Sequence, residues 1–411
     1  MALIPTPHLP PAFRRLAFSN MSAQLAEQLS LAAAPLVAVL LLNAGPAETG
    51  YLQTAQTLPF LVFSMLAGVL ADRISRRRLM VAAEVIRALS LATILVLLVG
   101  GLLNLPLLAA LGFLGAIGTV VYSVAAPAFL PVLVPHEGFA AANRWLELAR
   151  SAAYTAGPPL GGLVVGAMGA PAAFVGATAL SLSAIMLLAG LPTPAAAPPV
   201  RRAVLQEVRE GAAFVLTHPL LRPVLVTAVF FNTAWFVLQA VYVAYAVTSL
   251  RLTAAEVGAT LGTYGAGMVI GALLASRLAT RLPFGTMIAV GPAAGLVASL
   301  LMLATLICPS GLLAGLSLFL FGAGPILWTI TTTTLRQAVT PGSMLGRVSG
   351  FVMTATFGAR PLGAGIGALL ATQFGIAACL LASVAGFAIQ FLVLFGSAVR
   401  RLDRQPELLR T

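Results

Sequence analysis

Long apolar runs follow one another along almost the whole chain, with short polar turns between them. Each run holds about twenty or more residues, enough for a helix rising ~1.5 Å per residue to cross a ~30 Å hydrocarbon core. Backbone groups in hydrocarbon must be hydrogen-bonded within their own segment, so we expect these runs to be helices. The short alternating segments of a membrane β-barrel do not occur in the sequence. The pattern therefore predicts twelve transmembrane helices, near residues 16–42, 50–71, 79–101, 105–128, 140–167, 171–190, 220–248, 255–281, 285–307, 311–335, 344–370 and 374–398.

The longest connection, residues 191–219, divides the chain into two similar halves. It begins with the Pro-rich run PTPAAAPP and continues with a pattern typical of an amphipathic helix at the cytoplasmic surface. The triplet Pro-Leu-Gly at 159–161 recurs at 361–363. Weak internal repetition of this kind is typical of transporters that rock two bundles around a central site. We therefore predict an all-α integral membrane protein with two pseudo-symmetric six-helix bundles, residues 1–190 and 220–398, and a cytoplasmic tail, residues 399–411.

Composition excludes several classes of function. Hydrophobic residues make up 60% of the chain and charged residues 8%, so a large apolar surface must face lipid. All 23 basic residues are Arg, so the chain has no phosphate-binding loop of the kind that requires Lys. The three histidines, His8, His136 and His218, fall in predicted loops, and Cys308 and Cys379 lack a C-x-x-C spacing. We expect no metal site, no cofactor and no enzymatic chemistry.

The arginines also predict the orientation of the chain in the membrane. Nineteen lie in one alternating set of connections and tails, against one, Arg251, in the other set. This bias places both termini in the cytoplasm. Because the arginines are scattered among short loops, the net charge of +12 does not indicate a nucleic-acid partner. The Ala-rich, Lys-free composition favours a bacterial protein of the inner membrane.

Two motifs resemble those of a known transporter superfamily. Residues 68–78 read GVLADRISRRR and resemble the loop motif G-x-x-x-D-R-x-G-R-[RK] of the major facilitator superfamily. Residues 157–162 read GPPLGG and resemble the G-P-x-x-G-G antiporter motif of its drug:proton exporters. Residues 127–162 and 335–348 are similar to the branch that contains enterobactin and macrolide exporters. The resemblance implies secondary active export of a small amphipathic molecule, drug-like or siderophore-like, by alternating access in exchange for protons.

The same motifs predict a gate. In the loop motif, the acidic side chain can latch one conformation and the neighbouring arginine can neutralise it. In the antiporter motif, the glycines allow close helix packing and the proline bends the helix. Ser75 departs from the family pattern, where Gly is usual, and Ala275 fills the acidic position in the second half. The predicted gating residues are Gly68, Asp72, Arg73, Arg76, Gly157, Pro158, Gly161 and Gly162.

Acidic residues inside the predicted spans are the candidates for proton coupling. Ionisable groups in a membrane are costly and are commonly functional. Glu27 is the strongest candidate, because it shares a polar helix face with Asn20, Gln24 and Gln28. Glu147 and Asp72 complete the predicted set. The alternative for Glu27 is a static hydrogen-bonded acid that holds helices together, and the Glu84–Arg87 spacing predicts a structural ion pair.

Polar and aromatic positions at helical spacing predict a substrate cavity. Aromatic rings with a few amides suit bulky amphipathic ligands, although the same positions could serve only for packing. Arg360 has no acidic neighbour in its own helix and could meet another helix or an anionic substrate group. The predicted lining residues are Gln24, Gln56, Asn232, Trp235, Gln239, Tyr242 and Arg360.

These observations favour a monomeric exporter in the lipid bilayer with a small-molecule substrate and protons as partners. A proton-coupled metabolite importer and a non-transporting membrane sensor are the alternatives. The sign of the substrate charge stays open, because Glu27, Glu84 and Glu147 are matched in number by three intramembrane arginines.

Overall fold

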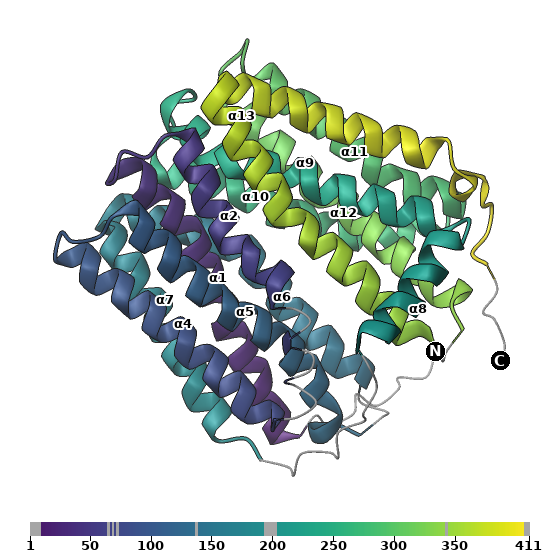
Figure 1. Cartoon of the computed structure of the whole chain (residues 1–411), viewed down its shortest axis with the longest axis horizontal. Coiled ribbons are helices and arrows are strands. Elements are labelled where there is room, and N and C mark those ends of the chain that lie inside the picture. Colours follow the sequence, from purple (N-terminus) through teal and green to yellow (C-terminus); the bar gives the residue numbers. More distant parts are fainter. Residues whose placement is uncertain are drawn as a thin grey trace. The chain divides into compact units, whose positions relative to one another are not determined.

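A computed structural model describes residues 10–63, 66–67, 70, 74–135, 139–192, 204–341 and 344–406 (Figure 1). Every regular element within these residues is a helix, which confirms the predicted fold class. The elements are α1 (Pro11–Leu40), α2 (Pro46–Val62), α4 (Arg76–Val99), α5 (Leu105–Leu133), α6 (Phe139–Met168), α7 (Ala170–Ala189), α8 (Val204–Thr217), α9 (Leu221–Thr248), α10 (Ala254–Ala279), α11 (Phe284–Ala304), α12 (Gly311–Val339), α13 (Leu345–Phe395) and the 3-10 helix η3 (Ala398–Arg401).

α5, α10 and α12 begin within one residue of the predicted boundaries, because local signals mark their starts. The side chains of Asn104, Thr253 and Ser310 each accept a hydrogen bond from a backbone N–H of the following first turn. α13 covers nearly all of the last two predicted spans, and it is interrupted at Gly375, the second residue of the last span, with φ 78° and ψ −177°. Only glycine adopts this backbone conformation at low cost, so the chain turns there.

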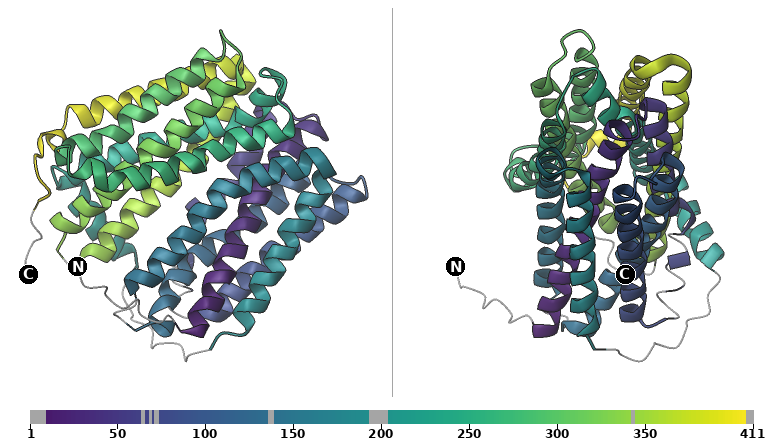
Figure 2. Two further views of the ribbon diagram at one scale, coloured as in Figure 1. Left: turned by 180° about the vertical axis from the view of Figure 1, so that it is seen from behind. Right: turned by 90° about the vertical axis from the view of Figure 1, so that its left-hand side faces the viewer.

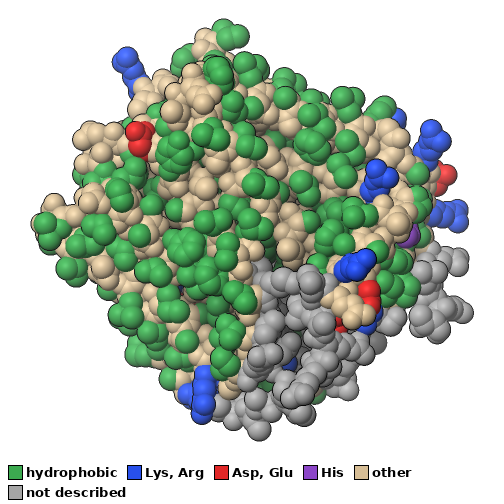
Figure 3. Space-filling model, in the orientation of Figure 1, with side chains coloured by type: hydrophobic (Ala, Val, Ile, Leu, Met, Phe, Trp, Pro, Cys, Tyr) green, Lys and Arg blue, Asp and Glu red, His purple; other side chains and the backbone are tan. Residues whose placement is uncertain are grey.

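Nine helices in the described part of the chain are long and apolar enough to cross a membrane. Large hydrophobic side chains are also widely exposed, among them Ile307 and Leu312. Figure 3 shows hydrophobic side chains spread over the visible face, with few charged ones among them. In water this exposure would be unfavourable, whereas a bilayer accommodates it.

The chain packs as two compact units. Unit 1 comprises Met1–Leu42 and Ala55–Val200, and unit 2 comprises Asn43–Thr54 and Arg201–Thr411. The start of α2 therefore packs with unit 2. Gly50 allows this contact, because a Cβ there would lie 2.7 Å from the Cα of Ala368 on α13.

Within unit 1, α1 packs against α6 and α7, and α4 packs against α5 and α7. Within unit 2, α9 packs along α13, and α12 packs against both α10 and α11. Neighbouring helices in each unit run roughly parallel or antiparallel (Figure 2). The amphipathic α8 packs on α13, where Arg347 Nη1 lies 2.6 Å from Glu210 Oε2.

Candidate functional site

The loop motif falls mostly outside the described residues. This applies to Gly68, Asp72 and Arg73, whose gating role stays a prediction. The described part shows an additional function for Arg77, which donates from Nε to the Leu188 carbonyl at 3.0 Å and from Nη2 to that of Ala189. These carbonyls lie at the C-terminal end of α7, so Arg77 joins the start of α4 to that end of α7. Arg76 begins α4 beside it.

A buried polar cluster joins four helices of unit 1. The Glu84 carboxylate on α4 lies 2.7 Å from Arg87 Nη1 and accepts a 2.7 Å hydrogen bond from the Ser181 hydroxyl on α7. Arg87 also donates to the Ala23 carbonyl on α1 at 3.2 Å and to Thr119 Oγ1 on α5 at 2.9 Å. Both charged side chains are buried. The predicted ion pair is confirmed, and its charges compensate each other inside the unit.

The antiporter-like motif forms a close seam between α1 and α6. A Cβ at Gly157 would overlap the side chain of Gln28, and one at Gly161 would lie 2.9 Å from the Cβ of Ala32. Pro158 has no N–H, so it interrupts the hydrogen-bond ladder next to this seam. Gly162 is also buried. The motif provides close packing, and its gating role remains a prediction.

The polar stripe of α1 turns largely toward protein. Asn20 and Gln28 are buried, and Gln28 Nε2 has no hydrogen-bond partner among the described residues. Gln24 and Glu27 are half-buried. Glu147 lies on α6, but its side chain is outside the described atoms. The structure thus places Glu27 in mid-helix with part of its surface accessible.

Two predicted cavity residues of α9 serve as core residues of unit 2. Trp235 is 7% exposed and packs on Tyr264 and Phe321, with ring centroids 5.0 and 4.9 Å away. Tyr242 is fully buried and donates from its hydroxyl to Thr260 Oγ1 at 2.6 Å. Both side chains are occupied by contacts within the unit. The structure therefore gives no support to cavity lining at these two positions.

Gln56 and Gln239 have different surroundings. Gln56 on α2 is buried, and a Cβ at Gly112 on α5 would lie 3.0 Å from its Cγ and Nε2. Gln239 on α9 is half-buried. Gln56 therefore helps α2 pack on α5, and the side chain of Gln239 remains partly exposed.

Asn232 and Arg360, which sequence analysis proposed separately, come together in unit 2. Arg360 Nε on α13 donates to Asn232 Oδ1 on α9 at 3.3 Å, and Asn232 Nδ2 donates to the Ala228 carbonyl at 3.0 Å. The guanidinium lies over the Phe357 ring, 4.1 Å from its centroid, and 5.6 Å from that of Phe236. Both polar side chains are half-buried. The described structure thus brings two of the predicted substrate-site residues into direct contact.

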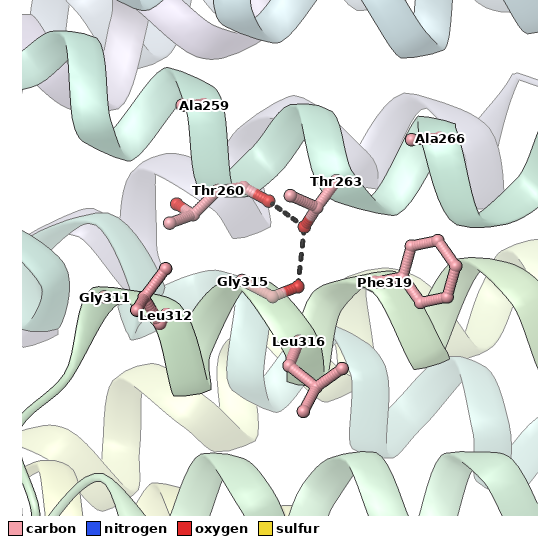
Figure 4. A pocket seen from close by; sticks show the side chains of 9 residues that line it. All are labelled: Ala259, Thr260, Thr263, Ala266, Gly311, Leu312, Gly315, Leu316 and Phe319. Carbon is pink, nitrogen blue, oxygen red and sulfur yellow. Dashed lines mark hydrogen bonds between the residues drawn. The ribbon is translucent and has the colours of Figure 1, made fainter.

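A groove of about 370 Å³ lies between α10 and α12 (Figure 4). Thr263 Oγ1 donates to the carbonyls of Thr260 and Gly315, both at 2.7 Å, so its hydroxyl is turned toward backbone. Leu312, which lines the groove, is 88% exposed. The groove therefore offers an apolar surface, and none of the predicted polar site residues lines it.

No cluster of three or more His, Cys, Asp or Glu that could hold a metal ion occurs in the described part of the chain.

The helical spans and the lipid-compatible surface are those of a multi-pass membrane protein. The chain belongs to the transmembrane secretion effector family of the major facilitator superfamily, whose sequence profile matches residues 6–408. The predicted superfamily is thereby confirmed, and with it the assignment as a transporter and not an enzyme.

Relatives with assigned functions are similar over nearly their full length. The multidrug efflux pump Tap of Mycolicibacterium fortuitum is 28% identical, with 94% of this chain and 96% of the relative covered. The enterobactin exporter EntS of Citrobacter koseri is 27% identical, with 96% and 94% covered. Both relatives are exporters, which agrees with the predicted class of secondary active exporter.

Solved structures share the fold at low identity. A bacterial homologue of the iron transporter ferroportin in an inward-facing state has a TM-score of 0.73 and 15% identity, with 93% of this chain and 98% of that chain covered. A D-xylose-proton symporter has a TM-score of 0.71 and 12% identity, with 94% and 97% covered. At this identity the likeness concerns the fold alone.

Proposed function

We propose that the protein exports a small amphipathic molecule across the bacterial inner membrane in exchange for entering protons, as a monomer with both termini in the cytoplasm. The similarity to a multidrug efflux pump and an enterobactin exporter supports the direction and the type of substrate. The arginine bias of the connections supports the orientation.

Glu27 carries the proton-coupling part of the proposal. It lies 16 residues after Pro11 and 13 before Leu40, the ends of α1, which puts it ~20 Å or more from either end of the helix. A coupling carboxylate must bind and release a proton during the cycle, so it needs access to water in at least one conformation. Glu27 is half-buried and keeps such access.

The comparison with Glu84 favours Glu27. Glu84 is fully buried, and its carboxylate contacts Arg87 Nη1 and the Ser181 hydroxyl, both at 2.7 Å. A fully buried carboxylate has no access to water in this conformation, whereas Glu27 keeps part of its surface accessible. Glu84 is therefore assigned a structural role and Glu27 the exchange of protons.

Transport in proteoliposomes with an imposed pH difference tests this assignment. Glu27→Gln keeps the side-chain size but cannot release a proton, so it should bind substrate and exchange it passively without accumulating it. Glu48→Gln is the matched control, because Glu48 is an exposed carboxylate in the first turn of α2, and it should accumulate substrate normally. Uphill transport by Glu27→Gln with unchanged pH dependence would move the coupling role to another acid, such as Glu147 or Asp72.

A further inference from the structure

The groove between α10 and α12 has walls suited to hydrocarbon (Figure 4). Its two threonines use their hydroxyls within the protein, because Thr260 Oγ1 accepts from the Tyr242 hydroxyl and Thr263 Oγ1 donates to backbone carbonyls. The remaining lining residues are Ala, Gly, Leu and Phe. Both hydroxyls thus have protein partners, and the groove suits an apolar occupant.

The groove opens on a lipid-facing side of unit 2. Leu312 and Leu316 on its α12 wall are 88% and 48% exposed. The same face of α10 continues beyond the groove with Ile270 and Leu273, which are 43% and 70% exposed. Both helices are long and apolar enough to span a membrane, and large apolar side chains exposed on such helices face lipid. The groove therefore adjoins acyl chains.

The length of the groove matches one leaflet of a bilayer. On α12 it extends from Gly311, the first residue of the helix, to Phe319, or ~12 Å of helix. One half of a ~30 Å hydrocarbon core measures ~15 Å. Leu252, which precedes α10, lies at the same end, since a Cβ at Gly311 would be 2.9 Å from its Cδ2. The groove thus runs from the membrane interface, where both helices begin, toward the middle of the bilayer.

Two opposite charges flank the interfacial end of the groove. Arg251, next to Leu252 in the chain, is exposed and makes no ion pair or hydrogen bond with the residues that the structure describes. Glu256 is exposed one turn before Ala259, a lining residue of α10. Its Oε2 accepts from Thr253 N and Thr253 Oγ1, both at 2.8 Å, which leaves Oε1 to a donor from outside the described chain. A cation and an anion are therefore both available at this end.

The position of Arg251 is unusual in two respects. It is the one arginine that the sequence places in the set of connections opposite to the other nineteen. Its φ of 56° is a left-handed conformation, which is unfavourable for a residue with a Cβ. Neither the charge distribution across the membrane nor the local backbone favours an arginine here, and such outliers are typical of positions that bind a ligand.

We propose that the groove binds one molecule of phosphatidylethanolamine, with an acyl chain between α10 and α12. Arg251 binds the phosphate, and Glu256 Oε1 accepts from the primary ammonium, so that the two charges match the zwitterionic headgroup. An anionic headgroup without an ammonium would be repelled by Glu256. In the proposed orientation the site lies in the outer leaflet. It is independent of the exported substrate and of proton coupling.

Photolabelling with three lipids of identical acyl chains tests the proposal. Each lipid carries a diazirine in mid-chain and an ethanolamine, glycerol or choline headgroup on its phosphate. The full-length protein in phosphatidylcholine nanodiscs receives one probe at a time, and peptide mass spectrometry maps the label. Labelling of the groove segments, residues 259–266 and 311–319, is expressed relative to labelling around Leu381, a 55% exposed residue of α13.

The wild-type protein should show a headgroup preference in the groove. The ethanolamine probe should exceed the glycerol probe by ~5-fold, the scale of one charge near a membrane surface. The choline probe should fall between them, because its methylated ammonium is charged but donates no hydrogen bond.

Substitutions separate the parts of the site. Glu256→Gln keeps a side chain that can cap the helix and should bring the ethanolamine probe down to the level of the glycerol probe. Arg251→Gln should lower groove labelling by all three probes. Ala259→Phe, at an exposed lining position, should fill the groove and have the same effect. Arg281→Gln removes an exposed charge beyond the other end of α10 and should behave as wild type.

Several results would overturn the proposal. Equal relative labelling by the three probes in the wild type would mean that the groove only adjoins bulk lipid. A stronger signal from the glycerol probe would indicate a general surface for anionic lipids instead. An ethanolamine preference that persists in Glu256→Gln would contradict the role of the carboxylate. Export by the wild type is measured separately in cells, and failure of the export proposal would leave these lipid results unchanged.

Discussion

Replacing Arg87 by Met is expected to be strongly destabilising, because it leaves the fully buried carboxylate of Glu84 without its countercharge. The substitution removes the 2.7 Å contact with Glu84 and the hydrogen bonds to the Ala23 carbonyl and Thr119 Oγ1. Loss of one partner from a buried ion pair costs ~3–5 kcal/mol. Only the Ser181 hydroxyl at 2.7 Å would then remain among the contacts described above for the carboxylate.

Substituting Glu84 as well tests whether the two buried charges depend on each other. Glu84→Gln alone leaves the guanidinium of Arg87 buried without its countercharge and should also destabilise. The double variant Glu84→Gln/Arg87→Met removes both charges, and its stability should lie within ~1–2 kcal/mol of wild type. The Gln side chain can still accept the hydrogen bond from Ser181.

The four proteins are compared by heating in detergent and measuring the monodisperse fraction by size-exclusion chromatography. Wild type and the double variant should melt at similar temperatures, and both single variants well below them. If the double variant is as unstable as the sum of its two single changes, Glu84 and Arg87 are not coupled and the account of this cluster is refuted.

Three further predictions concern other parts of the chain. Gly157→Leu should lower the melting temperature and the transport rate, because its side chain would overlap Gln28, whereas Gly346→Leu should be tolerated because a Cβ there meets nothing within 4 Å. Partial burial lowers the pKa of His218, whose Nδ1 accepts from the N–H groups of Leu220 and Leu221. Its contribution to stability should be complete above pH ~6.5 and fall as the pH drops from there toward the lowered pKa, and His218→Gln should remove this dependence in melting curves. A reporter active only in the cytoplasm, fused after Thr411, should give signal, and signal only from a reporter active outside would contradict the orientation.

The spans were predictable because continuous apolar runs leave few alternatives to a membrane helix. The turn within α13 occurs at Gly375, one residue after the predicted start of the last span at residue 374. The sequence marks this place, because a glycine there interrupts an otherwise apolar pattern. The start of α1 at Pro11 and not near residue 16 reflects a proline, which is well suited to a first helical turn.

The candidate sites were predictable only in part. Spacing shows which face of a helix a residue occupies, but it does not show which helix packs there. Trp235 and Tyr242 follow the period of a cavity-lining stripe, yet Tyr264 and Thr260 on α10 cover them. Arg360 and Asn232 are 128 residues apart in the sequence, so their contact depends on the packing of α13 along α9.

The most direct test of proton-coupled export uses everted membrane vesicles that contain the wild-type protein. With the vesicle interior acidified, an exported substrate found in a cell-based accumulation screen should accumulate inside, and collapse of the pH difference by nigericin should release it. Vesicles without the protein provide the background. Accumulation that persists after the pH difference has been abolished, or substrate movement that never exceeds equilibration, would contradict the account.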